Sequence, residues 1–134
     1  LDKIEIKDFN GAILDFDKML EIDSSDYLAY YNRGNVHYEL GRFSSAIEDY
    51  TKALNLFPDY FKIYTNRGYA KLSSNDSIGG CSDLRKSAEL GDSSVIDVIK
   101  EYCKWLFPKT VSTRFIDFKE SEFLSCFVFP IFIY

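Results

Sequence analysis

The chain has 134 residues, of which 46% are hydrophobic and 28% are charged, and it contains seven glycines and three prolines. This composition is typical of one soluble globular domain and excludes a disordered tail. The 21 acidic and 16 basic residues give a net charge of -5, and no run of Lys or Arg forms a phosphate-binding stripe, so we expect neither nucleic acid nor an anionic membrane as a partner.

The beginning of the chain carries no recognisable targeting signal. It starts at Leu1 without a methionine, and residues 1–10 are charged and mixed, without the apolar segment of a signal peptide. We therefore expect the sequence to be a fragment. Its cellular compartment stays open, with the cytoplasm favoured.

A period of 34 residues organises the first two-thirds of the sequence. The tripeptide at residues 32–34 (Asn-Arg-Gly) recurs at residues 66–68. A third copy of the repeat is indicated by five sets of three similar residues, each spaced 34 positions apart, which we call columns. These columns are Ala12, Ala46 and Gly80; Asp15, Asp49 and Asp83; Phe16, Tyr50 and Leu84; Lys18, Lys52 and Lys86; and Ile22, Leu56 and Leu90. A fixed period of this length predicts a repeat architecture.

Apolar residues recur at steps of three and four within each unit, which predicts helices. The first unit, residues 1–26, keeps only its second helix, over residues 8–22, after the tail of a lost first helix. In the second unit, residues 27–60, helices over 27–40 and 42–56 flank Gly41, and Pro58 follows them. Because that turn is short, the helices should pack antiparallel, with Gly34 and Ala46 at a close crossing.

The third unit, residues 61–94, is a degenerate copy whose second helix could be capped by Asp76 or Ser77. After Gly91, apolar residues over 95–107 predict a capping helix, since the last repeat of a solenoid needs a polar outer side. That side would be supplied by Asp97, Lys100, Glu101 and Lys104.

Residues 108–134 form a C-terminal tail that ends in a strongly hydrophobic stretch. A transmembrane helix needs roughly 20 apolar residues, and Pro130 interrupts this shorter stretch, so we expect no membrane span. The tail is either a segment that packs on the solenoid or the first part of a longer hydrophobic region.

The central unit resembles the tetratricopeptide repeat family, whose pattern places aromatic, small and proline residues at fixed positions. The matching positions are Tyr30, Arg33, Gly34, His37, Ala46, Tyr50, Ala53 and Pro58. Arg33 stands where leucine is usual, and His37 where tyrosine is usual. The resemblance implies an all-α fold, a tetratricopeptide-repeat helical solenoid of antiparallel helix pairs with a C-terminal capping helix, over about residues 1–107.

No arrangement of residues indicates catalysis, a metal site or a cofactor. Cys81, Cys103 and Cys126 lie far apart, and we interpret them as buried small hydrophobic residues. His37 is the only histidine, and no nucleophile with an orienting acid accompanies it at a recognisable spacing. We expect it to pack beneath a neighbouring helix.

Function is therefore expected to come from a concave surface that holds a peptide segment of another protein, since repeat proteins use such surfaces to bind partners. Helical spacing places amide and aromatic side chains on one face of the first helices of units two and three. Side-chain amides can pair with peptide backbone, and tyrosines add contact area. The predicted site residues are Tyr31, Asn32, Asn35, Tyr38, Lys62, Asn66 and Tyr69.

Within this set, Asn32 and Asn66 are expected to face solvent. One subgroup of the resembled family clamps a terminal carboxylate; Asn32 and Lys62 are similar to two clamp positions, but Asn66 replaces the arginine, so that specificity is not assigned. We expect no small-molecule substrate. The alternative is a docking or regulatory segment of a larger enzyme or envelope protein whose active part lies outside this chain.

Overall fold

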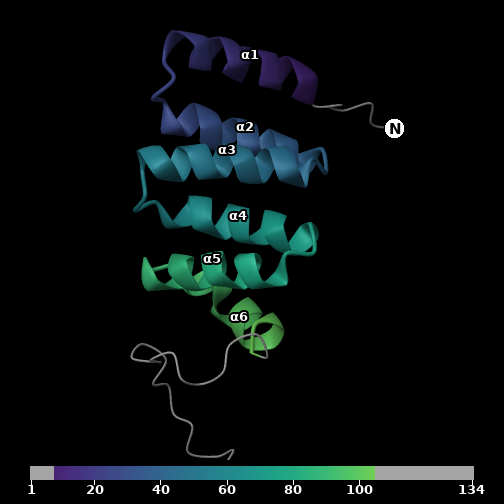
Figure 1. Cartoon of the computed structure of the whole chain (residues 1–134), viewed down its shortest axis with the longest axis vertical. Coiled ribbons are helices and arrows are strands. Elements are labelled where there is room, and N and C mark those ends of the chain that lie inside the picture. Colours follow the sequence, from purple (N-terminus) through teal and green to yellow (C-terminus); the bar gives the residue numbers. More distant parts are fainter. Residues whose placement is uncertain (1–7, 105–134) are drawn as a thin grey trace, which may run out of the picture.

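The structure, a computed structural model, describes residues 8–104 of the chain. Over this range it contains helices and no strands, and the helices follow one another along the long axis of the molecule (Figure 1). The predicted tail at residues 108–134 and the end of the predicted capping helix lie outside the described residues.

One helix, two helix pairs and a terminal helical segment make up the array. The elements are α1 (Phe9–Ile22), α2 (Tyr27–Glu39), α3 (Phe43–Leu56), α4 (Phe61–Ser73), α5 (Ser77–Glu89), the 3-10 helix η1 (Ser93–Val95) and α6 (Ile96–Tyr102). The pairs are α2 with α3 and α4 with α5, and α1 precedes the first pair (Figure 1). The predicted order of helices is confirmed. None of the described helices combines the length and hydrophobicity needed to cross a membrane.

Aspartate side chains explain where α1, α2 and α5 begin. Asp8, Asp26 and Asp76 each accept hydrogen bonds from backbone N–H groups of the first helical turn, at 2.8 to 3.1 Å. A short carboxylate at this position satisfies amides that have no partner inside the helix. Of the two residues that the sequence offered as the cap of α5, Asp76 rather than Ser77 holds the position.

The turns inside the two helix pairs use equivalent residues one period apart. Gly41 lies between α2 and α3 with φ 70°, and Asn75 lies between α4 and α5 with φ 66°. This left-handed conformation favours glycine, and asparagine is among the few other residues that adopt it readily. The predicted place of Gly41 between two helices is confirmed, and Asn75 takes the equivalent place in the next pair.

The apolar core follows the array as two clusters of buried side chains. The first joins α3 and α4 through Ala46, Tyr50, Ala53, Leu54, Ile63 and Ala70. The second joins α5 to the terminal segment through Cys81, Leu84, Val95, Ile99 and Cys103. Each pair thus buries its apolar face partly on the next element, as expected for stacked repeats.

Gly34 lies against the aromatic ring of Tyr50 in the crossing of α2 with α3. A Cβ atom at Gly34 would be 2.8 Å from Cε1 of Tyr50, so the tight contact of this glycine is with that ring, and its close approach to Ala46 stays a prediction. In the next pair the equivalent small residues lie close together, because a Cβ at Gly68 would be 3.1 Å from the carbonyl oxygen of Gly80. Both crossings therefore require a glycine on the first helix.

Replacing Gly34 with leucine is expected to lower the free energy of unfolding by about 1–3 kcal/mol, because the side chain would overpack the buried ring of Tyr50. The melting temperature of the whole chain, followed by circular dichroism, measures this loss. Asn32→Leu, on the exposed side of the same helix, is the matched control and should leave the melting temperature nearly unchanged. Equal melting temperatures for Gly34→Leu and the wild type would contradict the tight crossing.

The terminal segment has the polar outer side that was predicted. Val95, Ile99 and Cys103 are buried against α5, and the four predicted polar residues, Asp97, Lys100, Glu101 and Lys104, are exposed together with the ring of Tyr102. The helix is shorter than the range 95–107: Asp92 begins η1 by accepting the backbone N–H of Ser94, and α6 ends at Tyr102.

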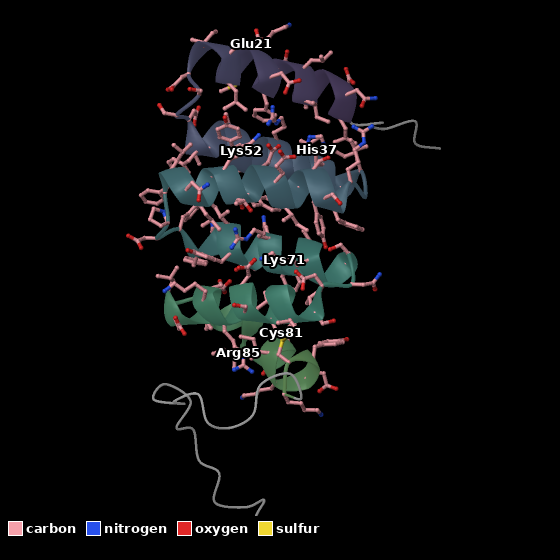
Figure 2. The ribbon with its side chains drawn as sticks, in the orientation of Figure 1. Glu21, His37, Lys52, Lys71, Cys81 and Arg85 are labelled. Atoms are coloured by element: carbon pink, nitrogen blue, oxygen red, sulfur yellow. A yellow bond between two sulfur atoms is a disulfide. The ribbon has the colours of Figure 1, made fainter. Side chains whose placement is uncertain are left out.

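Cys81 and Cys103 form a disulfide bond, which the sequence interpretation missed. Both residues are fully buried, as predicted, but their sulfur atoms are bonded to each other and fasten α5 to the end of α6 (Figure 2). The spacing of 22 residues gave no recognisable signal, since only the fold places their Cα atoms 5.6 Å apart. Cys126 lies outside the described residues.

Candidate functional site

The seven residues predicted to form a binding surface all lie on α2 and α4, the first helices of the two pairs. Asn32 and Lys62 are exposed, whereas the other five are half-buried: Tyr31, Asn35, Tyr38, Asn66 and Tyr69. Because α2 and α4 also contact each other directly, side chains from both helices meet on one side of the array. We call the part formed by these seven residues the α2–α4 surface.

Hydrogen bonds join three of the seven residues to one another and to α3. Asn66 Nδ2 donates to Asn35 Oδ1 at 2.8 Å and to Tyr31 Oη at 3.1 Å. The hydroxyl of Tyr50 donates to the same Asn35 oxygen at 2.7 Å. The cluster of Tyr31, Asn35, Tyr50 and Asn66 therefore fixes the spacing of α2 and α4.

This cluster changes the role expected for Asn66. Its amide was predicted to face solvent, but the residue is half-buried and its Nδ2 group is bonded to two neighbouring side chains, so that expectation is wrong for its donor atoms. Asn35 instead has donors to spare, since only its oxygen takes part in the cluster within the described part of the chain. Asn32 remains an exposed amide, as predicted.

The tyrosines of the surface pack against other rings. Tyr31 lies edge-on to Tyr60 at 5.9 Å between ring centroids, and Tyr38 lies edge-on to Phe43 at 5.4 Å. Burial raises the pKa of Tyr69, with a further contribution from the negative charge of Asp92. This phenol therefore stays protonated, and can donate a hydrogen bond, throughout the neutral range.

Behind the α4 end of this surface, two hydroxyl groups converge on one buried carboxylate. Thr65 Oγ1 is 2.6 Å from Asp92 Oδ2, and Ser87 Oγ is 3.1 Å from the same oxygen. Burial raises the pKa of Asp92, but hydrogen bonds from Ser94, Thr65 and Ser87 outweigh this effect and hold the pKa below its usual value. The hydroxyls have a carboxylate partner but no imidazole base, so the geometry does not form a nucleophile for covalent chemistry.

Between α2 and α3, a largely buried ion pair is formed by Arg33, which stands where the family usually has leucine. Arg33 donates to both carboxylate oxygens of Asp49, at 2.8 and 2.6 Å, and to Asp17 on α1. Hydrogen bonding to Asp49 is the main cause that raises the pKa of Arg33, so the guanidinium is always charged. One arginine thereby joins three helices.

The same arrangement recurs one period later. Arg67 donates to both oxygens of Asp83, at 2.7 and 2.8 Å, and to Thr51 Oγ1 at 3.0 Å. Lys71, labelled in Figure 2, adds a second cation 2.9 Å from Asp83. These pairs were not predicted, although the sequence carries a signal for them: Arg33 and Arg67 each precede an aspartate of the Asp15, Asp49 and Asp83 column by 16 residues.

His37 packs against the neighbouring helix α3, as predicted, and there it lies beside the ion pair of Arg33 and Asp49. Its Nε2 atom is 3.9 Å from Asp49 Oδ2, and its Nδ1 atom is buried without a hydrogen-bond partner in the described structure. Burial lowers the pKa of His37, although Asp49 acts in the opposite direction. The imidazole is thus neutral at physiological pH, and its contacts are those of a packed side chain.

A shallow hollow of about 370 Å³ lies away from the α2–α4 surface, between α1, α2 and α3. Its cations already have partners, since Arg33 binds two carboxylates and Lys52 lies 3.7 Å from Glu48. Among the described residues, no group of three or more His, Cys, Asp or Glu side chains could hold a metal ion. The α2–α4 surface therefore remains the candidate site.

The family model of the tetratricopeptide repeat matches residues 27–60. These residues are a tetratricopeptide repeat. The match covers α2, α3 and the turn that follows, and its boundaries equal those predicted for the second unit. No curated protein sequence matches the chain.

Solved tetratricopeptide-repeat structures share the fold of this chain. The tetratricopeptide-repeat domain of Arabidopsis OM64 is 25% identical, with a TM-score of 0.69 over 74% of this chain and 84% of that one. The N-terminal domain of stress-induced protein-1 from C. elegans is 24% identical, with a TM-score of 0.68 over 73% and 84%. The first repeat domain of Spaghetti (RPAP3), bound to the HSP90 peptide SRMEEVD, is 22% identical, with a TM-score of 0.68 over 73% and 79%. The helical-solenoid prediction is confirmed.

Proposed function

We propose that this chain is a non-catalytic interaction module that binds a peptide segment of a partner protein on the α2–α4 surface. The observation that carries the proposal is the cluster of Tyr31, Asn35, Tyr50 and Asn66, which orders a surface with unused amide donors. A surface that is rigid before binding loses less conformational entropy when the partner arrives.

Polar groups in and around this cluster suit a polypeptide ligand. The amide of Asn32 and the spare donors of Asn35 can pair with the carbonyl and N–H groups of a peptide backbone. Lys62 adds a positive charge at the α4 end, suited to an acidic side chain. The RPAP3 structure holds a peptide on the same fold, which supports a peptide ligand without identifying it here.

Binding is expected to be modest, because two repeats offer a small interface. Micromolar affinity, about -8 kcal/mol, is a reasonable expectation for such a contact. If the asparagine side chains of this surface bind the backbone of the partner, the partner segment should be extended, as in other modes of peptide recognition.

Two amide substitutions should separate binding from stability. Asn32→Ala is expected to weaken capture of partners by the immobilised chain without changing its melting temperature, because this side chain is exposed. Asn66→Ala should weaken capture and also lower the free energy of unfolding by about 1 kcal/mol, since it breaks the hydrogen bonds to Tyr31 and Asn35. Affinity capture with mass spectrometry, together with thermal melting, measures both effects.

The matched control is Asn55→Ala, an exposed amide on α3, which should leave capture and stability unchanged. If capture is as sensitive to Asn55→Ala as to Asn32→Ala, the binding surface lies on the second helices instead. Capture that is unaffected by both Asn32→Ala and Asn66→Ala would remove the basis for the proposal.

A further inference from the structure

In both helix pairs a third side chain approaches the ion pair of arginine and aspartate from the same position on the first helix. His37 on α2 and Lys71 on α4 are 34 residues apart, so the period makes them equivalent (both are labelled in Figure 2). Lys71 Nζ lies 2.9 Å from Asp83 Oδ2. His37 Nε2 is 3.9 Å from the equivalent oxygen of Asp49. One pair thus has an ordinary cation at this position, and the other has a side chain that becomes a cation only in acid.

The imidazole of His37 has no hydrogen-bond partner in the part of the chain that the structure describes. Its side chain is 15% exposed, its Nδ1 atom is buried, and neither ring nitrogen is hydrogen-bonded. A neutral imidazole has one N–H group, whereas a protonated imidazole has an N–H group on both nitrogens. In the protonated ring the N–H group at Nδ1 would therefore be buried without an acceptor, which is unfavourable.

The ring of His37 is largely buried among charged groups from three helices. Burial is the largest effect on its pKa and lowers it. Asp49 on α3 and Asp17 on α1 act in the opposite direction, but both carboxylates are already bound to Arg33. Arg33 on α2 and Arg42 at the start of α3 lower the pKa further. The imidazole therefore binds a proton less readily in the folded chain than in the unfolded chain.

We propose that the contact between α2 and α3 is acid-sensitive, because it loosens when His37 takes up a proton, whereas the contact between α4 and α5 does not. As the pH falls, the unfolded chain binds the proton first, since its histidine has the ordinary pKa of about 6.5. The free energy of unfolding is therefore highest well above that pH and decreases as the pH falls through the lower pKa of the folded chain. The second pair contains no histidine, and its Lys71 is held by Asp83, so it has no equivalent step. This inference does not depend on the proposed function.

The single histidine makes the test direct, because no other type of side chain has an ordinary pKa between pH 5.5 and 7.5. Proton NMR of the whole chain gives the pKa of His37 from its ring signals, both in the folded state and in urea. We expect the pKa of the folded state to be the lower of the two. In urea unfolding followed by circular dichroism, the equilibrium constant of unfolding should rise as the pH falls from 7.5 to 5.5, by at most about tenfold per pH unit.

The matched variant is His37→Gln, whose side chain stays neutral, so its unfolding should not respond to pH in this range. Amide hydrogen exchange locates the effect: the excess of the wild-type rate over the rate of the variant should grow between pH 7.5 and 5.5 in α2 and α3, and stay constant in α4 and α5. A folded-state pKa equal to or above the unfolded-state pKa would overturn the proposal, as would a His37→Gln variant that responds to pH like the wild type. An excess that grows equally in all helices would mean that no single contact loosens, and would also overturn it.

Discussion

Replacing Asp83 with alanine is expected to lower the free energy of unfolding by about 3–5 kcal/mol, because it leaves the largely buried cations of Arg67 and Lys71 without their carboxylate partner. Asp83 accepts hydrogen bonds from Nε and Nη2 of Arg67, and its Oδ2 atom lies 2.9 Å from Nζ of Lys71. The side chains of Arg67 and Lys71 are only 15% and 19% exposed, so water cannot replace the lost carboxylate well. This is the largest effect of a single substitution that we expect in the described structure.

Urea unfolding followed by circular dichroism measures the loss, and Asp15→Ala is the matched control. Asp15 belongs to the same column of the repeat but is exposed, so its removal should leave the unfolding midpoint nearly unchanged. A combined variant, Arg67→Met with Lys71→Met and Asp83→Leu, should recover part of the stability, since apolar residues can replace a buried ion cluster. If Asp83→Ala loses less than about 1 kcal/mol, water reaches these cations and the ion pair is not buried in solution.

Reduction of the Cys81–Cys103 bond is expected to lower the free energy of unfolding by about 3 kcal/mol. The bond closes a loop with a sequence separation of 22 residues and so limits the freedom of the unfolded chain. The effect should concentrate at the end of the array, because the bond fastens α6 to α5. Amide hydrogen exchange in η1 and α6 should therefore quicken more than exchange in α2 and α3.

Unfolding with and without reductant provides this measurement on the whole chain. The control is the Cys81→Ala and Cys103→Ala double variant, whose stability should not respond to reductant. Equal stability of the oxidised and reduced wild type would show that the disulfide bond does little to restrict the unfolded chain. A uniform rise in exchange over the whole chain would show that α6 is not a local unit.

The repeat architecture was predictable because the 34-residue period, the helical spacing of apolar residues and the capping residues all indicated the same helix boundaries. The helices predicted over 8–22, 27–40 and 42–56 match α1, α2 and α3 to within one residue at each end, with the flanking residues acting as caps. The end of α6 was harder to place. Apolar spacing continued past Tyr102, and nothing in the pattern marked Cys103 as bonded to α5.

Contacts between helices were less accessible to sequence reasoning. The spacing of three and four placed the seven predicted residues on α2 and α4, but it could not show that Asn66 binds Tyr31 and Asn35 rather than facing solvent. To recognise the pair of Arg33 and Asp49, one has to know how the two antiparallel helices are aligned, because it is this alignment that brings together residues 16 positions apart. An arginine at a position usually filled by leucine was the available signal.

The buried charges also determine which repeats can be recombined with these. A helix bearing the usual leucine, if grafted in place of α4, would bury the Asp83 carboxylate without its guanidinium. In the reverse exchange, α4 placed on an apolar second helix would bury the Arg67 guanidinium without a carboxylate. Both hybrids lose an essential partner, at a cost of several kcal/mol. Chimaeric arrays built from this chain should therefore exchange first and second helices only as matched pairs.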